Sequence, residues 1–375
     1  MKDVKVTLKR KEVSDQELDL NNDLKKQKPH KPSIVRSRIN ADKEIWDKVT
    51  ILNEDCRTSG IISRLEPNFK KADTLAAYLC SPFTDYLSTD YMDLGWGCGY
   101  RNCQMLMSFL ERQTEDGEPI LKCVLDIASI QLLIEKAWEE GFDTLGAAQL
   151  GYQVFKTHKW IGTTEVYTLF AYLGIRSTII DFHRPGPNHL HHDLMDWIQS
   201  YFMEEDNKEI VCITNKPPLY LQHQGHSRTV VGIEILKSGK RNLIMFDPGR
   251  RVLRSYRSSN KQEEEEEVVE IKQTNEQEEE EEEVDILSND DDDNDAKSLK
   301  KRVIAVQNMN HLPSGLLRPF RVDDKTIGKH KQYQILVLGQ VNYQDGNMVW
   351  DSKKSFLLNE DERESMKNVT SLTVI

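Results

Sequence analysis

The chain has few cysteines and no long apolar run. Its six cysteines are spread over 375 residues at irregular spacings, which excludes a disulfide framework. No apolar segment after Met1 is typical of a secretion signal, and no run reaches the roughly 18 apolar residues that a membrane-spanning helix needs. We therefore expect a soluble protein of a reducing compartment, cytoplasmic, nuclear or both. Cysteines in such a protein are catalytic or buried rather than bridged.

The chain also lacks a concentrated basic face. Its formal charge of −12 comes from one segment, 261–297, in which 13 Glu, 6 Asp and 3 Lys give −16 and leave +4 for all other residues. A nearly neutral folded part argues against direct nucleic-acid binding. The acidic segment itself is typical of a solvated charge run, although an acidic interaction protein that binds basic partners is an alternative.

Metal-ligating patterns are scarce as well. Four histidines gather around a Pro-Gly turn, but no cysteine or carboxylate lies beside them at a ligand spacing. The four are His183, His189, His191 and His192. We expect them to form a solvated loop, and we expect neither a metal nor another cofactor.

Composition divides the chain into five parts. Residues 1–44 are polar and predict a disordered or loosely structured arm, whereas 45–57 carry an apolar stripe at helical spacing. That stripe predicts a short helix, either docked on the core or binding a partner. The remaining ranges are a single domain over 58–257 and 301–345, an acidic disordered insert over 258–300 within it, and a C-terminal tail over 346–375.

Periodicity predicts helices first and strands afterwards. Helical spacing covers 127–141, 163–174 and 191–203, and strand-like runs cover 176–182, 209–215, 219–224, 228–236, 241–247 and 329–341. Thr163 is the expected N-cap of its helix. A Lys-Ser-Gly-Lys turn between 228–236 and 241–247 predicts a hairpin. This order favours an α+β domain with a mainly antiparallel sheet over alternating βαβ units.

The stretch "DLGWGCGYRNCQML" holds two cysteines of different character. Cys98 lies at the expected start of a helix, where the free N–H groups and partial positive charge lower the pKa of a thiol. Gly95, Gly97 and Gly99 would leave room for a substrate backbone. Cys103 lies one turn further along, and we expect a small buried side chain there. Local sequence alone leaves Cys98 open between a nucleophile and a buried thiol.

A nucleophilic cysteine needs a base and a group that orients the base. His226 precedes a β-branched strand, and His223 in the preceding run is the alternative. Asp247 ends the next strand, so the hairpin would bring it to the same open end as His226. Asp247 could equally open an ordinary Asp-Pro-Gly turn. A cysteine at a helix start followed by a histidine and an aspartate on strands is the papain-like order of elements.

The residues resemble a known family over well over half of the chain. The segments "DLGWGCGYRNCQM", "KPPLYLQHQGHSRTVVGIE", "FDPG" and "KHKQYQI" are similar to the cysteine peptidases that include the proteases of ubiquitin-fold modifier, and most similar to their zinc-finger-containing ubiquitin peptidase branch, ZUFSP. The resemblance implies a papain-like fold, with the cysteine at a helix N-terminus packed against a mainly antiparallel sheet that carries the histidine and the aspartate.

The resemblance also implies roles for individual residues. Cys98 would be the nucleophile, His226 the general base and Asp247 its orienter, and Tyr86 would contribute to the oxyanion hole, with Tyr91 and Asp93 as alternatives. The residues of the implied substrate-tail channel are Gly95, Trp96 and Gly97.

The implied reaction is cleavage after the C-terminal Gly-Gly of ubiquitin in polyubiquitin chains or conjugates, with a preference for lysine-63 linkages. Modifier-specific relatives place a histidine directly after Asp-Pro, whereas this chain has Asp247-Pro248-Gly249, which favours ubiquitin. Zinc-finger ligand spacing is absent from residues 1–57, which leaves the linkage preference open. A protease for ubiquitin-fold modifier and a non-catalytic ubiquitin-binding relative are the alternatives.

Overall fold

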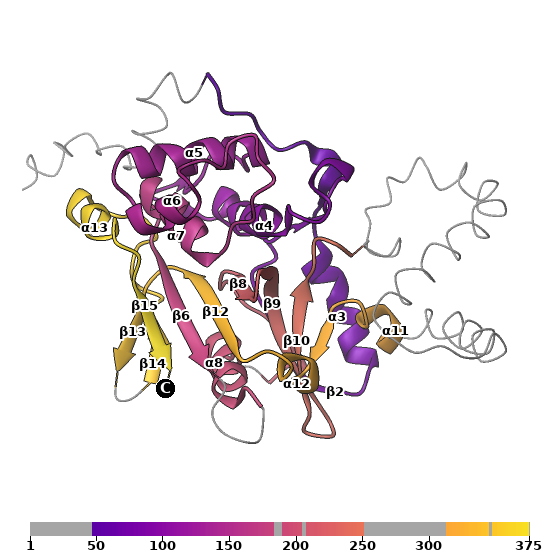
Figure 1. Cartoon of the computed structure of the whole chain (residues 1–375). Coiled ribbons are helices and arrows are strands. Elements are labelled where there is room, and N and C mark those ends of the chain that lie inside the picture. Colours follow the sequence, from indigo (N-terminus) through magenta and orange to yellow (C-terminus); the bar gives the residue numbers. More distant parts are fainter. Residues whose placement is uncertain (1–46, 184–189, 205–207, 251–312, 345–346, 375) are drawn as a thin grey trace, which may run out of the picture. The chain divides into compact units, whose positions relative to one another are not determined.

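The computed structural model describes residues 47–183, 190–204, 208–250, 313–344 and 347–374 (Figure 1). The predicted arm over 1–44 and the predicted acidic insert over 258–300 lie outside these ranges. Within them, no helix combines the length and the apolar character that crossing a membrane requires.

One sheet of nine strands organises the described residues. Its main order is β11-β10-β9-β8-β12-β6-β15, with β2 on β9 and β7 on β2. Most neighbours are antiparallel, and the parallel pairs are β15 with β6 and β7 with β2. The strands are β2 Thr74–Leu79, β6 Ser177–His183, β7 Val211–Ile213, β8 Leu219–His223, β9 His226–Leu236, β10 Arg241–Phe246, β11 Arg321–Asp323, β12 Gln332–Leu338 and β15 Ser371–Val374.

Helices and short strands complete the domain. The α-helices are α3 Ile61–Lys71, α4 Cys98–Arg112, α5 Ile127–Glu139, α6 Thr144–Gln149, α7 Thr163–Tyr172, α8 His192–Phe202, α11 Pro313–Leu317, α12 Asp324–Ile327 and α13 Glu360–Ser365, and the 3₁₀ turns are η2 Glu54–Cys56 and η3 Tyr91–Asp93. Three two-stranded pairs lie beside the main sheet: β1 Arg57–Thr58 with β3 Tyr86–Leu87, β4 Thr114–Glu115 with β5 Glu118–Pro119, and β13 Val341–Gln344 with β14 Asn347–Trp350.

Helix α4 is buried along most of its length. Its apolar positions Met105, Leu106, Phe109 and Leu110 are all fully buried, as the helical spacing predicts. The helix packs on β9 and β8 on one side and on α5 on the other (Figure 1). Helix α4 thus lies between the sheet and α5, whereas α7 packs on β6, β12 and β8 of the same sheet.

The structure confirms the hairpin, whereas the predicted order of helices before strands holds only in part, because β2 of the main sheet precedes α4, and α11, α12 and α13 follow β10. The strands β9 and β10 pair in antiparallel fashion, with Met245 opposite Val230 and Phe246 opposite Thr229. Strand β11 pairs with β10, so the chain on both sides of residues 251–312 belongs to one sheet. The prediction of mixed helices and a mainly antiparallel sheet therefore holds for the described residues.

Three local predictions were wrong. Residues 47–57 form a turn, an Ile51–Leu125 bridge and η2 rather than an α-helix, although Leu52 docks on the core. The N-cap of α7 is Gly162 instead of Thr163, and the Gly162 N–H donates to the Glu165 carboxylate (2.7 Å). Residues 347–374 are not a loose tail, because they form β14, α13 and β15, and β15 adds a strand to the main sheet.

Candidate active site

Cys98 occupies the first helical position of α4, directly after the N-cap Gly97. The helix terminus therefore presents its free N–H groups and partial positive charge at this thiol. Cys103 follows on the same helix but is fully buried, and burial raises the pKa of its thiol. The expectation of two unequal cysteines, one at the terminus and one in the core, is confirmed.

The three glycines around Cys98 have different reasons to be glycines. Gly95 has a φ of +84° and open space where a side chain would be. A Cβ at Gly97 would clash with the Asp93 carboxylate, and one at Gly99 would clash with the Ile161 carbonyl. The expectation that all three leave room for a substrate was therefore wrong for Gly97 and Gly99, because the protein's own atoms fill that space.

His226 reaches the site from the first position of β9. A tight turn with positive φ at Gln224 (37°) and Gly225 (79°) joins β8 to β9 and pairs His223 with His226 across the two strands. Of the influences that lower the pKa of the Cys98 thiol, the interaction with the His226 side chain is the largest. The structure thus brings together a helix terminus and a histidine that lie far apart in the sequence.

The thiol of Cys98 is electrostatically distinct from the other cysteines. Burial by itself raises its pKa, but hydrogen bonds from His226 and from the backbone and side chain of Ser227 outweigh burial, so the pKa of Cys98 lies below its ordinary value. Burial instead raises the pKa of Cys56, Cys80 and Cys123. Thiolate character is therefore favoured at Cys98.

His223 is placed unlike His226. Its ring stacks on His330 with the centroids 3.7 Å apart, and its Nδ1 is buried without a hydrogen-bond partner among the described residues. Burial, reinforced by the nearby charges of His330, His226 and Arg228, lowers the pKa of His223 to about 3. At neutral pH His223 is uncharged, so it cannot supply the proton that a thiolate–imidazolium pair needs.

Asp247 lies at the end of β10, near the start of β9, as the hairpin predicts. Its carboxylate accepts a hydrogen bond from Arg228 Nε (2.8 Å) and another from the Gly249 N–H (3.1 Å). No hydrogen bond joins it to His226 in the described part of the chain. The register of the two strands explains this, because the last pair is Phe246 with Thr229, so Asp247, the residue after β10, is nearer to Arg228 than to His226 at the start of β9.

Tyr86 is not placed for the predicted oxyanion role. It is 2% exposed, and its hydroxyl donates to the carbonyl of Asp247 (2.6 Å) and also contacts the carbonyl of Arg250. The hydroxyl proton is therefore committed to backbone oxygens near Asp247. Of the alternatives, Tyr91 is 87% exposed on η3, and the Asp93 carboxylate is held by Arg101.

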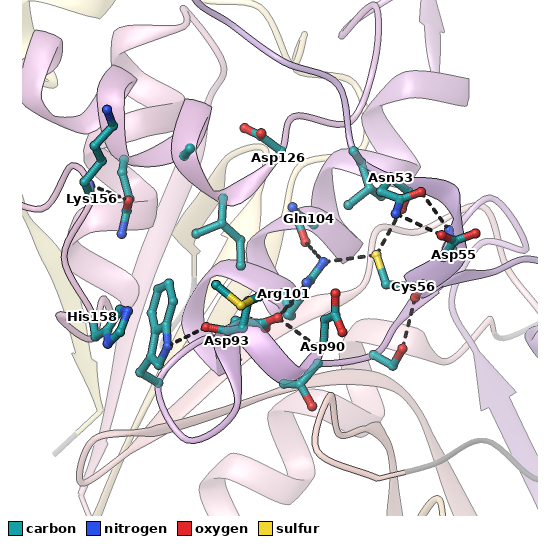
Figure 2. Close-up of a pocket in the computed structure, with 18 of the residues that line it drawn as sticks. Asn53, Asp55, Cys56, Asp90, Asp93, Arg101, Gln104, Asp126, Lys156 and His158 are labelled. Carbon is teal, nitrogen blue, oxygen red and sulfur yellow. Dashed lines mark hydrogen bonds and ion pairs between the residues drawn. The ribbon is translucent and has the colours of Figure 1, made fainter.

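A pocket of about 520 Å³ lies beside α4, on the side that carries Arg101 and Gln104. Figure 2 shows Arg101 between Asp93, with which it forms a bidentate ion pair (2.7 and 2.9 Å), and the Cys56 thiol, to which its Nη1 donates (3.0 Å). Trp96, a predicted channel residue, lines this pocket and stacks on His158 with the ring centroids 4.8 Å apart.

Sequence reasoning missed the residues that hold this region together. Arg101, Asn102 and Ser227 are polar, buried and central to the contacts around Cys98. Local sequence does not mark them, because Asn102 and Ser227 meet across 125 residues and Arg101 reaches Cys56 across 45. Strand alternation could have found Arg228, which shares a face of β9 with His226.

The expectation of solvated histidines near the Pro-Gly turn holds for His183 and His192, which are exposed, but not for His191. His191 is buried and its Nε2 is 2.8 Å from the carbonyl of His330, and His189 lies outside the described residues. No group of three or more metal-ligating side chains suited to an ion occurs in the described ranges.

Comparison with known proteins gives matches in the same region. The model of peptidase family C78 matches residues 73–287. Zinc finger-containing ubiquitin peptidase 1 is 45% identical over 198 residues in Mus musculus and over 199 residues in Homo sapiens, covering 52% of this chain and 34% of each relative. The chain thus spans about a third of the length of these relatives.

A further relative and a solved structure also match. Ubiquitin carboxyl-terminal hydrolase mug105 of Schizosaccharomyces pombe is 35% identical over 167 residues, which are 42% of this chain and 62% of the relative. The crystal structure of UfSP from C. elegans gives a TM-score of 0.37 at 12% identity, covering 73% of this chain and 36% of that chain.

Proposed function

We propose, from the premise that this chain belongs to peptidase family C78, that it is a thiol isopeptidase that cleaves after the C-terminus of ubiquitin. The family and the mixed helix-and-sheet architecture indicate a papain-like cysteine protease fold. The observation that carries the proposal is the contact between His226 and Cys98 at the N-terminus of α4, with the thiol pKa lowered there. The relatives are a zinc finger-containing ubiquitin peptidase and a ubiquitin carboxyl-terminal hydrolase, and they supply the substrate class.

The proposed reaction begins with the Cys98 thiolate and a protonated His226. The sulfur attacks the isopeptide carbonyl carbon, and the Cys98 N–H at the helix terminus is available to the developing oxyanion. His226 then gives its proton to the lysine amine as the carbon–nitrogen bond breaks. Water, deprotonated by His226, hydrolyses the thioester and returns the thiolate.

Asp247 is proposed to orient His226 indirectly rather than by the direct contact of a simple triad. The pairing of β9 with β10 supports a shared location for the two residues. Arg228 binds the Asp247 carboxylate and stands two residues from His226 on the same strand.

The proposed substrate includes polyubiquitin with a preference for lysine-63 linkages, which a di-ubiquitin panel of all linkages tests.

We expect a ubiquitin probe with a C-terminal electrophile to label the wild-type full chain at Cys98. Peptide mapping of the adduct identifies the residue, and a matched probe built on ubiquitin-fold modifier is the comparison. Preferential labelling by the modifier probe would mean that ubiquitin-fold modifier, and not ubiquitin, is the substrate. Binding of ubiquitin without any adduct in reducing buffer would instead indicate a non-catalytic relative.

We expect His226→Ala to reduce turnover of a ubiquitin substrate by about 10²- to 10⁴-fold, the usual contribution of a general acid–base group. His223→Phe is the matched control, because it keeps an aromatic ring for the stack on His330 and should retain turnover near the wild-type level. Steady-state kinetics at pH 7 provides the measurement. Full activity in His226→Ala together with loss in His223→Phe would reverse the assignment of the two histidines.

A further inference from the structure

The last part of the connection from α6 to α7, residues 158–162, forms a strap across the candidate site. The carbonyl of Lys159 in this strap accepts a hydrogen bond from the Tyr100 hydroxyl of α4 (3.0 Å). A Cβ at Gly99 would lie 2.4 Å from the Ile161 carbonyl oxygen, so the strap backbone packs directly on the first turn of α4. The strap is therefore in contact with the two residues that follow the nucleophile.

The same strap also reaches the turn that carries the base. A Cβ at Gly225 would lie 3.0 Å from Cζ3 and 3.2 Å from Cε3 of Trp160, so this ring packs on the backbone of the residue before His226. The N–H of Thr163, directly after the strap, donates to Gln222 Oε1 on β8 (2.6 Å). The strap is thus joined both to the β8–β9 turn and to the strand that leads into it.

Helix α4 holds the chain on the other side of His226. Asn102 Nδ2 donates to the Ser227 carbonyl (2.9 Å), and Asn102 Oδ1 accepts from Thr229 Oγ1 (2.7 Å). These contacts fix β9 after His226, whereas Trp160 packs on the turn before it. With the backbone held on both sides, the imidazole can move relative to α4 only by rotation of its side chain.

We propose that the strap sets the spacing between the N-terminus of α4 and the β8–β9 turn, and that Trp160 is a positioning residue for His226. This proposal deepens the proposed function, on which its catalytic meaning rests. Misplacement of a catalytic group by about 1 Å can lower a rate about 10²-fold, so the spacing matters. Because Trp160 is 57% exposed, its removal opens no cavity in the core and acts mainly on the turn.

The first measurement is the pH dependence of Cys98 alkylation by iodoacetamide on the full chain, with peptide mapping to separate Cys98 from the other thiols. The interaction with His226 is the largest influence that lowers the pKa of this thiol. Displacement of the imidazole should weaken that influence, so we expect Trp160→Ala to move the alkylation midpoint upward by about half a pH unit to one unit. Trp160→Phe keeps an aromatic ring beside Gly225 and should restore most of the wild-type midpoint.

The other charged and titratable groups around His226 are the same in these variants. They are His223 on β8, Arg228 on β9 and His330 before β12, and Arg228 is paired with Asp247 (2.8 Å). A change in the alkylation midpoint therefore reports displacement of His226 and not the loss of one of these groups.

Steady-state turnover of a ubiquitin substrate separates positioning from substrate binding. Trp160→Ala should lower kcat by about 10- to 100-fold and leave KM within about twofold of the wild-type value, because the strap acts on the base. A raised KM with unchanged kcat and an unchanged alkylation midpoint would make Trp160 a substrate contact and overturn the proposal.

Tyr152→Ala is the matched control. Tyr152 lies on the same connection between α6 and α7 and is 61% exposed, but it stands outside the strap. Its loss should leave the alkylation midpoint and kcat at the wild-type values, and thermal melting checks that each variant is folded. A folded Trp160→Ala variant with the wild-type midpoint overturns the proposal, as do equal shifts in the Trp160 and Tyr152 variants.

The alkylation assay contains no ubiquitin, so its outcome is independent of the substrate class. A shifted midpoint in a Trp160→Ala variant of a protein that no ubiquitin probe labels would support the role of the strap and reject the proposed function. An unshifted midpoint in a protein that the probe labels would reject the role of the strap and keep the proposed function.

Discussion

Cys98→Ala is expected to abolish turnover of ubiquitin substrates and covalent labelling by the ubiquitin probe. The covalent route needs a thiolate at the N-terminus of α4, and no other described cysteine combines that place with a lowered thiol pKa. The loss should be complete rather than partial, because alanine leaves no nucleophile. Gel-shift labelling and steady-state hydrolysis measure the two effects.

Cys103→Ala provides the control on the same helix. It removes a thiol that is fully buried and whose pKa burial raises, so labelling and turnover should persist. The expected effect is on stability alone, of the size seen when a small buried group is deleted, about 1 kcal/mol. Labelling that survives Cys98→Ala but disappears in Cys103→Ala would show that Cys103, and not Cys98, is the nucleophile.

Arg101→Met is expected to lower the free energy of unfolding by about 3–5 kcal/mol, the usual effect of removing one partner of a buried ion pair. Its partner Asp93 is 2% exposed and would be left as an uncompensated buried carboxylate. Asp93 also accepts the Asp90 N–H (2.8 Å) and packs against Gly97, so the segment leading to Cys98 should loosen. Urea unfolding gives the free energy, and probe labelling reports the effect on the site.

Arg112→Met on the same helix is the matched control. Arg112 pairs with the buried Asp85, but Arg57 binds that carboxylate as well (2.6 Å), so one partner remains. The loss of stability should therefore be clearly smaller than for Arg101→Met. Equal losses of unfolding free energy in the two variants would mean that the Arg101–Asp93 pair contributes no more to stability than the Arg112–Asp85 pair does.

The sequence predicted which helix and strands carry Cys98, His226 and Asp247, because local patterns determine those positions. A glycine-rich lead-in before an apolar helix places Cys98 at a helix start, and two strand-like runs joined by a turn place His226 and Asp247 near one edge. Period-2 and period-3.6 patterns carry this information without knowledge of distant contacts. The same patterns could not choose between His223 and His226, a choice that depends on the stacking of His223 against His330.

What the sequence could not provide depends on contacts between distant segments. The Asp247 carboxylate is bound by Arg228, a consequence of the exact register of β9 and β10. Gly97 and Gly99 are glycines because Asp93 and Ile161 pack against them, which spacing alone does not reveal. Strand β15 joins the sheet beside β6 by parallel pairing, and its short sequence carries no signal of that partner.

The pairing of β10 with β11 brings two distant parts of the chain together at one edge of the sheet. Ile244 lies opposite Arg321, so each strand holds the other in register through their own backbone pairing. Pairs this far apart in the sequence raise the contact order of a domain, and a high contact order slows folding. The completion of this edge is therefore expected to be among the slower steps in folding of the sheet that supports the nucleophile.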